Sequence, residues 1–292
     1  MILVTGATGN AGSHVVRALQ ARGASVRAFV RDPEKARSLF GVEVELAVGD
    51  FADPPSLDRA LDGVQAMLLS CADDPRRVEW ETKAIEAAAA VGVGRIVKLS
   101  TIGARPGAPV AFWDWHGRVE ERLRSSGVPY ASLQSSFYMS NVLAAVEQVA
   151  RERRLHAPAG EARIAMIDPS DVGAVAAAVL TGAGEDGRTY VLTGPRAIAY
   201  AEVAAVLSAA TGRKIEFVDV SDEGARQGLL AAGTPEFVAE QLLAIFAQLR
   251  RGVAARVTDT VEALTGASPR SFAEFARDHA HLFAPAVVAS GR

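Results

Sequence analysis

Short apolar runs alternate with amphipathic stretches over the first 135 residues of the chain. The apolar runs predict six buried strands, and apolar positions spaced by three or four residues between them predict helices. The strands are expected at 1–5, 25–30, 42–48, 64–70, 95–100 and 129–134. The helices are expected at 10–22, 33–40, 55–61, 76–91 and 112–126. This alternation indicates an α/β fold with a doubly wound parallel sheet of Rossmann type.

The pattern changes after residue 135. The expected elements are extended segments near Leu155 and at 164–167, a helix from Asp168 or Ser170, strands at 189–193 and 214–220, and helices over 236–283. We therefore predict a nucleotide-binding domain at 1–135, completed by segments within 165–193. A smaller helix-rich lobe is predicted at 136–164 and 194–292. Residues 284–292 are expected to form a frayed tail.

Composition and charge exclude several classes of protein. The 292 residues carry a net charge of −3, which gives no global attraction for nucleic acid or for an anionic membrane. No run of about 18 apolar residues predicts a membrane span. The single cysteine, Cys71, excludes a disulfide framework, and the histidines show no metal-ligand spacing. We expect a cytoplasmic monomer or homodimer that holds no metal and acts on a small molecule.

A glycine-rich loop lies between the first strand and the first helix. It consists of Thr5, Gly6, Ala7, Thr8, Gly9, Asn10, Ala11 and Gly12. In dinucleotide-binding folds the first glycine permits a tight turn, the second lets a pyrophosphate approach the backbone, and the third lets the helix pack closely. The helix N-terminus offers N–H groups and a positive dipole end to the phosphates. The place of this loop favours nucleotide binding over a purely structural turn.

Residues after the second and third strands indicate which dinucleotide binds. Arg31 stands where a 2′-phosphate would lie and Lys35 follows one helical turn later, so NADP(H) is preferred over NAD(H). The alternative is that Asp32 faces the ribose and Arg31 is a solvated surface charge. Asp50 and Phe51 are expected to contact the adenine, unless Asp50 serves only as a turn or helix cap.

Three more residues are expected along the cofactor, at the strand ends that bind ligands in such sheets. Ser70 and Cys71 follow the fourth strand, and Ser100 ends the fifth. Ser100 either contacts the nicotinamide ribose or makes a local turn bond. Cys71 has no adjacent basic partner, so a packed thiol is favoured over a nucleophile.

These motifs resemble those of the NmrA-like group of atypical short-chain dehydrogenases/reductases. The resemblance covers most of the chain and rests on residues 5–12 (TGATGNAG), 26–33 (VRAFVRDP), 49–53 (GDFAD), 98–102 (KLSTI), 120–130 (EERLRSSGVPY), 137–141 (FYMSN), 167–172 (IDPSDV) and 193–195 (TGP). It implies an NAD(P)-binding fold. The group includes NADPH-dependent quinone and dye reductases, and also regulators that bind NAD(P) without known chemistry, so the resemblance does not imply one activity.

The chain departs from the Tyr-x-x-x-Lys pair of extended relatives. Phe112 takes the tyrosine position, His116 takes the lysine position, and Gln134 stands where an arginine is often found. Phe has no proton to give, so an activity that relies on the usual pair is in doubt, whereas hydride transfer belongs to the nicotinamide. His116, the candidate catalytic residue, has three open roles: hydrogen bonding to the ribose, proton donation, or a structural bond to a backbone carbonyl.

The missing tyrosine favours electron-poor substrates. Reducing a simple ketone creates a basic alkoxide that needs a positioned acid, whereas a reduced quinone carries a phenolate-like oxygen with a pKa of about 10. The candidate substrate pocket consists of Phe112, Trp113, Gln134, Phe137, Tyr138 and Asn141. Its aromatic residues form either a pocket for a ring or core between the lobes. Asn141 either bonds the substrate or caps a helix over 142–151.

The sequence therefore predicts an NADPH-dependent oxidoreductase. It would transfer hydride to a small electron-poor ring compound, such as a quinone, a dye or an activated carbonyl. One alternative is an NADP(H)-sensing regulator without turnover. Another is a reductase of a specialised carbonyl or imine in a biosynthetic pathway.

Overall fold

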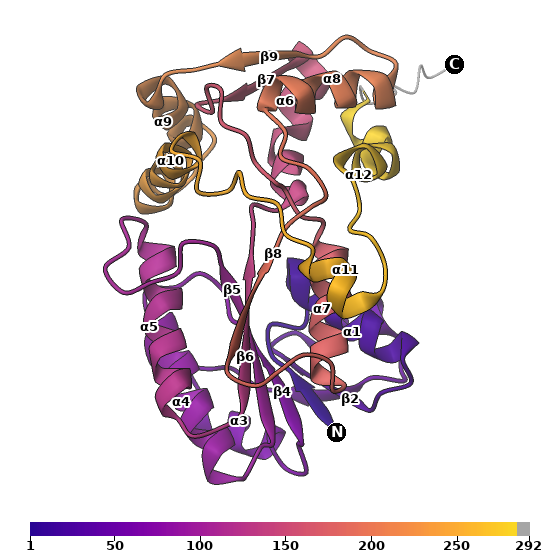
Figure 1. The fold of residues 1–292 in the computed structure, drawn as a ribbon, viewed down its shortest axis with the longest axis vertical. Coiled ribbons are helices and arrows are strands. Elements are labelled where there is room, and N and C mark those ends of the chain that lie inside the picture. Colours follow the sequence, from indigo (N-terminus) through magenta and orange to yellow (C-terminus); the bar gives the residue numbers. More distant parts are fainter. Residues whose placement is uncertain (285–292) are drawn as a thin grey trace. The chain divides into compact units, whose positions relative to one another are not determined.

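The computed structural model describes residues 1–284, and the chain folds as two compact units (Figure 1). Unit 1 comprises Met1–Ser135, Pro169–Leu192 and Thr258–Ser268. Unit 2 comprises Ser136–Asp168, Thr193–Val257 and the chain from Pro269 onward. The chain thus passes from one unit to the other several times, and unit 1 includes a segment from the C-terminal region. Of the frayed tail predicted at 284–292, all but Ala284 lies outside the described residues.

The core of unit 1 is a sheet of seven parallel strands. Their order across the sheet is β3-β2-β1-β4-β5-β6-β8. The strands are β1 (Ile2–Val4), β2 (Val26–Val30), β3 (Glu45–Val48), β4 (Ala66–Leu69), β5 (Arg95–Thr101), β6 (Tyr130–Ser135) and β8 (Arg188–Leu192). The strand order reverses between β1 and β4, which is the point where ligands bind in such sheets. The predicted doubly wound Rossmann-type fold is confirmed, and the strand expected at 189–193 is its seventh member, with Leu192 opposite Ser135.

Helices cover both faces of this sheet (Figure 1). One face carries α3 (Pro54–Ala60), α4 (Arg77–Ala90) and α5 (Ala111–Ser125), and the other carries α1 (Asn10–Ala21), α7 (Pro169–Leu180) and α11 (Thr260–Thr265). The remaining helix of the domain is α2 (Pro33–Phe40). Helices α1 and α7 cross at Gly173, where a Cβ would lie 2.6 Å from the Cβ of His14. Only glycine permits so close an approach of the two helices.

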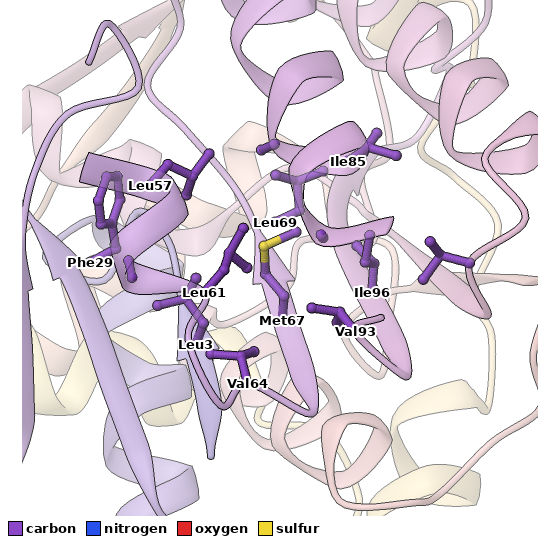
Figure 2. Close-up of a cluster of buried hydrophobic side chains, with 14 of the residues drawn as sticks. Leu3, Phe29, Leu57, Leu61, Val64, Met67, Leu69, Ile85, Val93 and Ile96 are labelled. Carbon is purple, nitrogen blue, oxygen red and sulfur yellow. The ribbon is translucent and has the colours of Figure 1, made fainter. Parts of the chain in front are cut away.

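Apolar side chains fill the space between the sheet and helices α3 to α5. Figure 2 shows part of this cluster, in which Leu57 of α3 and Ile85 of α4 lie over Leu3, Met67 and Ile96 of three neighbouring strands. Burial of such side chains stabilises the fold by about 1.5–3 kcal/mol each. On β5 the cluster ends at Ile96, and the polar side chains of Lys98 and Ser100 follow on the same face toward the carboxyl end of the strand.

Unit 2 is mainly helical. It comprises the 3₁₀ helix η1 (Met139–Ala145), α6 (Val146–Glu152), α8 (Tyr200–Thr211), α9 (Asp222–Ala231), α10 (Glu236–Arg250), α12 (Phe272–His279) and η2 (Ala280–Phe283). Strands β7 (Arg154–Ala157) and β9 (Glu216–Asp219) pair in parallel beside them. The segment expected at 164–167 forms single bridges at Ile164 and Ile167 and is not part of a named strand among residues 1–284.

The helix expected at 142–151 begins differently from the prediction. The chain first forms the 3₁₀ helix η1 from Met139 and becomes α-helical only at Val146, with Ala145 as the N-cap. The interpretation of Asn141 as the cap of this helix is therefore wrong. The sequence pattern also missed α8 and α9. Among residues 1–284, no helix is long and apolar enough to span a membrane.

Candidate functional site

The glycine loop connects β1 to α1 at the point where the strand order reverses. Gly6 has a φ of +62°, and a Cβ on it would lie 2.8 Å from the Ser70 carbonyl oxygen. A Cβ on Gly12 would lie 2.1 Å from the carbonyl oxygen of Gly6. These two glycines are therefore required by the fold of the loop itself. Gly9 is exposed, has a negative φ and precedes the first turn of α1.

The loop fits a pyrophosphate. In the described part of the chain no side chain caps the N-terminus of α1, so its first N–H groups are not satisfied by a side chain of the helix cap. Such a terminus attracts anions through these N–H groups and the helix dipole. Thr5 holds the loop in place, because its hydroxyl lies 2.9 Å from the carbonyl oxygens of Leu68 and Ser70 and accepts from the Ser70 N–H. The loop is thus bound to the end of β4.

The structure distinguishes the two charges after β2. The Asp32 carboxylate accepts from the Lys35 N–H at 2.9 Å and so caps α2. This oxygen therefore has a local role at the start of α2. The Arg31 guanidinium is mostly exposed and lies 3.9 Å from one oxygen of Asp50, and Lys35 is exposed. Both cations are accessible to a phosphate.

Asp50 and Phe51 belong to a small cluster at the same edge of the sheet. Asp50 Oδ1 accepts from the Ala52 N–H at 2.8 Å. This hydrogen bond stabilises a local turn, as in the predicted alternative that Asp50 serves as a turn or helix cap. Phe51 contacts Phe29 edge-on and lies nearly parallel to Trp80, with ring centroids 6.5 Å apart. Arg76 lies over the Trp80 ring. The sequence did not predict a role for Trp80 or Arg76, because nothing in their spacing connects this helix with the end of β3.

Cys71 lies just beyond β4 and is half-buried. Burial raises the pKa of its thiol to about 12, and the Glu81 carboxylate adds to this rise. A thiol with so high a pKa supplies almost no thiolate at neutral pH. The raised pKa thus favours a packed side chain over a nucleophile.

Polar side chains form a layer between the sheet and helices α4 and α5, near the carboxyl ends of β5 and β6. We call it the polar layer, and it consists of Arg77, Glu81, Lys98, His116, Glu120 and Gln134, with Ser132. Lys98 of β5 and Glu81 of α4 are fully buried, and the Lys98 Nζ lies 3.1 Å from the Glu81 carboxylate. Burial lowers the pKa of Lys98, and Glu81 offsets part of that fall.

Arg77 and His116 form the part of the polar layer next to Cys71. The Arg77 guanidinium donates through Nη1 to His116 Nε2 and through Nη2 to the Cys71 carbonyl oxygen. Burial, followed by the cations of Lys98 and Arg77, holds the pKa of His116 well below its usual value. The ring is therefore neutral at physiological pH. The sequence predicted a role for His116 but not its partner, which lies 39 positions earlier.

Gln134 and Glu120 form the other part of the polar layer. The Gln134 amide lies 3.1 Å from both oxygens of the buried Glu120 carboxylate, and the Ser132 hydroxyl donates to it at 2.6 Å. The amide N–H groups of Gln134 thus satisfy a buried carboxylate. This contact accounts for the amide of Gln134 without any substrate. The role of Gln134 in the substrate pocket stays a prediction.

The remaining candidates in unit 1 lie around the ends of β5 and α5. Ser100 is buried, and its hydroxyl has no hydrogen-bond partner among the described residues, which suits a ligand contact. Phe112 contacts Trp115 edge-on, with centroids 5.4 Å apart. Trp113 is buried against Gly103, where a Cβ would lie 2.5 Å from the indole. Trp113 thus packs against the backbone after β5, and its role in the substrate pocket stays a prediction.

The other three pocket candidates belong to unit 2. Phe137 lies 6.1 Å from the ring of Phe246, which in turn lies 5.8 Å from the ring of Tyr200. Tyr138 pairs with Ile167 through a single bridge, and Asn141 is exposed. Within its unit, Phe137 is thus one member of an aromatic cluster that the sequence did not predict.

Comparison with known proteins adds to this geometry. The model of the NmrA-like family matches residues 1–276. The chain is 38% identical over 286 residues to an NAD(P)H azoreductase of Xenophilus azovorans, covering 98% of this chain and 100% of that protein. It is 40% identical over 286 residues to the (4-alkanoyl-5-oxo-2,5-dihydrofuran-3-yl)methyl phosphate reductase of Streptomyces griseus, with the same coverage. The structure resembles the NADPH complex of an Escherichia coli quinone oxidoreductase, with a TM-score of 0.87, 30% identity, and coverage of 97% of this chain and 100% of that one.

Proposed function

The chain belongs to the NmrA-like family and is an NAD(P)H-dependent oxidoreductase, and we propose that it transfers hydride from NADPH to a small electron-poor ring substrate. The observation that carries this proposal is the loop of Gly6, Gly9 and Gly12, bound by Thr5 to the end of β4 and followed by an uncapped helix N-terminus. These residues would hold the pyrophosphate. The cofactor, when bound, supplies the hydride.

NADP(H) is the preferred cofactor in this proposal. Asp32 Oδ1 is engaged as the cap of α2, which favours a local role for this carboxylate over one at the ribose hydroxyls. Arg31 and Lys35 present two exposed cations next to that position. Charge-assisted hydrogen bonds from such groups bind a phosphate strongly.

The substrate class follows from the weak proton-donating ability of the two residues at the positions of the usual Tyr–Lys pair. Phe112 replaces the usual acid, and His116 is held neutral by its surroundings. A substrate whose reduced form is a weak base needs no strong acid in the site. Quinones and ring alkenes conjugated to two carbonyl groups share this property, because their reduced forms are a phenolate and a stabilised enolate. The names of two relatives cover these chemistries, since one is a quinone oxidoreductase and the other reduces an acylated dihydrofuranone, which is a conjugated ring.

Anaerobic stopped-flow measurements test the proposal. NADPH oxidation is followed with a panel of benzoquinones, azo dyes and acylated dihydrofuranones, and simple ketones serve as the comparison. We expect turnover with members of the panel and none with the ketones. Tight NADPH binding with no turnover on any acceptor would instead support the sensor without chemistry.

A further inference from the structure

Arg77 connects two elements that approach the expected nicotinamide end of the site. It is the first residue of α4 and is almost completely buried. One guanidinium donates both to the Cys71 carbonyl, in the loop after β4, and to the ring of His116 on α5. The Asp73 carboxylate lies 3.2 Å from the same Nη1 and balances the charge from the solvent side.

The hydrogen bond from Arg77 determines the state of His116. A guanidinium is only a donor and does not lose its proton in proteins. His116 Nε2 must therefore accept, so its lone pair is free of a proton and the single N–H of the neutral ring is on Nδ1. That nitrogen is enclosed and has no hydrogen-bond partner among the described residues. The imidazole is thus an acceptor bound to Arg77 and is not placed to pass a proton to a substrate.

The charges around His116 favour the same state. Arg77 and Glu81 approach the ring from α4, and Lys98 approaches it from β5. Cys71 and Asp73 lie in the loop after β4. Glu120 lies one helical turn further along α5. Glu81 is paired with Lys98, and Glu120 is satisfied by Ser132 and Gln134. Neither carboxylate bonds the imidazole, whereas two cations lie near it. Protonation of the ring would add a third positive charge.

We propose that Arg77 is a positioning residue that fixes the loop after β4 (residues 70–72) against α5, with His116 as its neutral hydrogen-bond acceptor. This inference rests on the proposed function, since it assigns the loop and α5 to the nicotinamide end of that site. It replaces the three open roles of His116 with one. His116 holds Arg77, Arg77 holds the Cys71 carbonyl, and the loop is thereby shaped before the cofactor arrives.

The first test needs neither cofactor nor substrate. Long-range ¹H–¹⁵N correlation spectra of the uniformly ¹⁵N-labelled protein distinguish the two neutral tautomers from the imidazolium. We expect His116 to be in the Nδ1–H form and unchanged between pH 5.5 and 8, with the exposed His281 as an internal comparison. An imidazolium signal, or the Nε2–H form, would overturn the proposal.

The second test compares two substitutions that retain different parts of the imidazole. In His116→Gln the amide oxygen can still accept from Arg77, whereas in His116→Asn the shorter amide cannot reach it. We expect His116→Gln to keep NADPH affinity within about threefold and kcat near that of the parent. His116→Asn and Arg77→Met should weaken NADPH binding by about tenfold or more, because the loop then spends only a small fraction of the time in its binding-competent position. Lys83→Met, in an exposed ion pair on the same helix, is the matched control.

The outcomes separate this inference from the proposed function. Equal loss of kcat in both His116 variants with unchanged affinity would show that the ring itself acts on the substrate, and would overturn the proposal. Unchanged NADPH affinity in Arg77→Met would do the same, provided that this variant unfolds at the same temperature as the parent protein. If the affinities follow the expected order but no acceptor is reduced, the positioning role stands and the proposed reductase activity fails. Arg77→Lys keeps the positive charge but has a single nitrogen in place of the two guanidinium nitrogens that bond His116 and the Cys71 carbonyl. This variant should therefore bind NADPH as weakly as Arg77→Met.

Discussion

The ammonium of Lys98 lies 3.1 Å from the carboxylate of Glu81, and neither side chain has any solvent exposure. Burying two charges costs several kcal/mol for each ion, and their attraction offsets this cost only when both are present. The pair lies directly below the carboxyl end of β5, where the next side chain on the same face is Ser100. A rigid charged pair in this place holds α4 to the sheet beside the site.

Breaking this pair should destabilise the protein strongly. Glu81→Gln and Lys98→Met each leave one buried charge without its partner, so we expect the free energy of unfolding to fall by about 3–5 kcal/mol. The double variant Glu81→Leu with Lys98→Met should recover most of that loss, because no charge is then buried. Urea unfolding measures all three. Glu79→Gln, in the exposed pair with Lys83, should change stability by less than about 1 kcal/mol.

Gly9 and Gly12 should respond differently to added side chains. Gly9→Val should fold but lose NADPH binding, because Gly9 is exposed where the pyrophosphate would pass. Gly12→Ala should instead destabilise the fold, since its Cβ would lie 2.1 Å from the Gly6 carbonyl oxygen. Calorimetric titration with NADPH and thermal unfolding separate the two effects. Micromolar NADPH binding by Gly9→Val would exclude the loop as the phosphate site.

Arg31 should discriminate between the two nicotinamide cofactors. Arg31→Ala removes a charge-assisted contact to the 2′-phosphate, which contributes about 1.5–3 kcal/mol, so NADPH affinity should fall at least tenfold. NADH affinity should change little, because NADH lacks that phosphate. The exposed Arg17 of α1 is the matched control. Parallel loss of both cofactors in Arg31→Ala would show that Arg31 serves another part of the dinucleotide.

The Cys71 thiol should be inert in the folded protein. Burial raises its pKa from 9.0 to about 12, so at pH 8 its thiolate fraction is about a thousandfold lower than that of an unperturbed cysteine. Alkylation with iodoacetamide should be correspondingly slow and should accelerate about tenfold per pH unit above pH 8. The protein unfolded in urea provides the control, because its thiol should react at the ordinary rate. Rapid modification of the native protein at pH 8 would contradict the assignment.

His116 should make the protein less stable in acid. Its pKa is well below 6.5 when folded and returns to about 6.5 on unfolding, so below that pH the unfolded chain takes up a proton that the folded chain does not. Stability should therefore fall with pH below 6.5, at up to about 1.4 kcal/mol per pH unit for this group. His116→Gln should remove this part of the slope between pH 6.5 and 5. Identical slopes in the two proteins would show that the folded ring titrates normally.

Local patterns in the sequence determined the sheet, most of its helices and the cofactor loop. Strand and helix spacing depend on which side chains along one segment are apolar, and Gly6, Gly9 and Gly12 lie within seven consecutive positions. The α2 helix was predicted with its observed bounds, Pro33–Phe40, because Pro at its start and Gly41 after its end are local signals. The place of Phe112 and His116 on one helix face followed from their spacing alone.

Only the tertiary structure decided which distant side chains meet. Lys98 and Glu81 are 17 positions apart, and Arg77 and His116 are 39 apart, so each contact depends on how α4 and α5 lie over the sheet. No local signal marks that packing, because the register between a helix and a sheet is set by the fit of whole surfaces. The sequence therefore identified His116 as a residue of interest, but its partner, its tautomer and its charge follow from the fold.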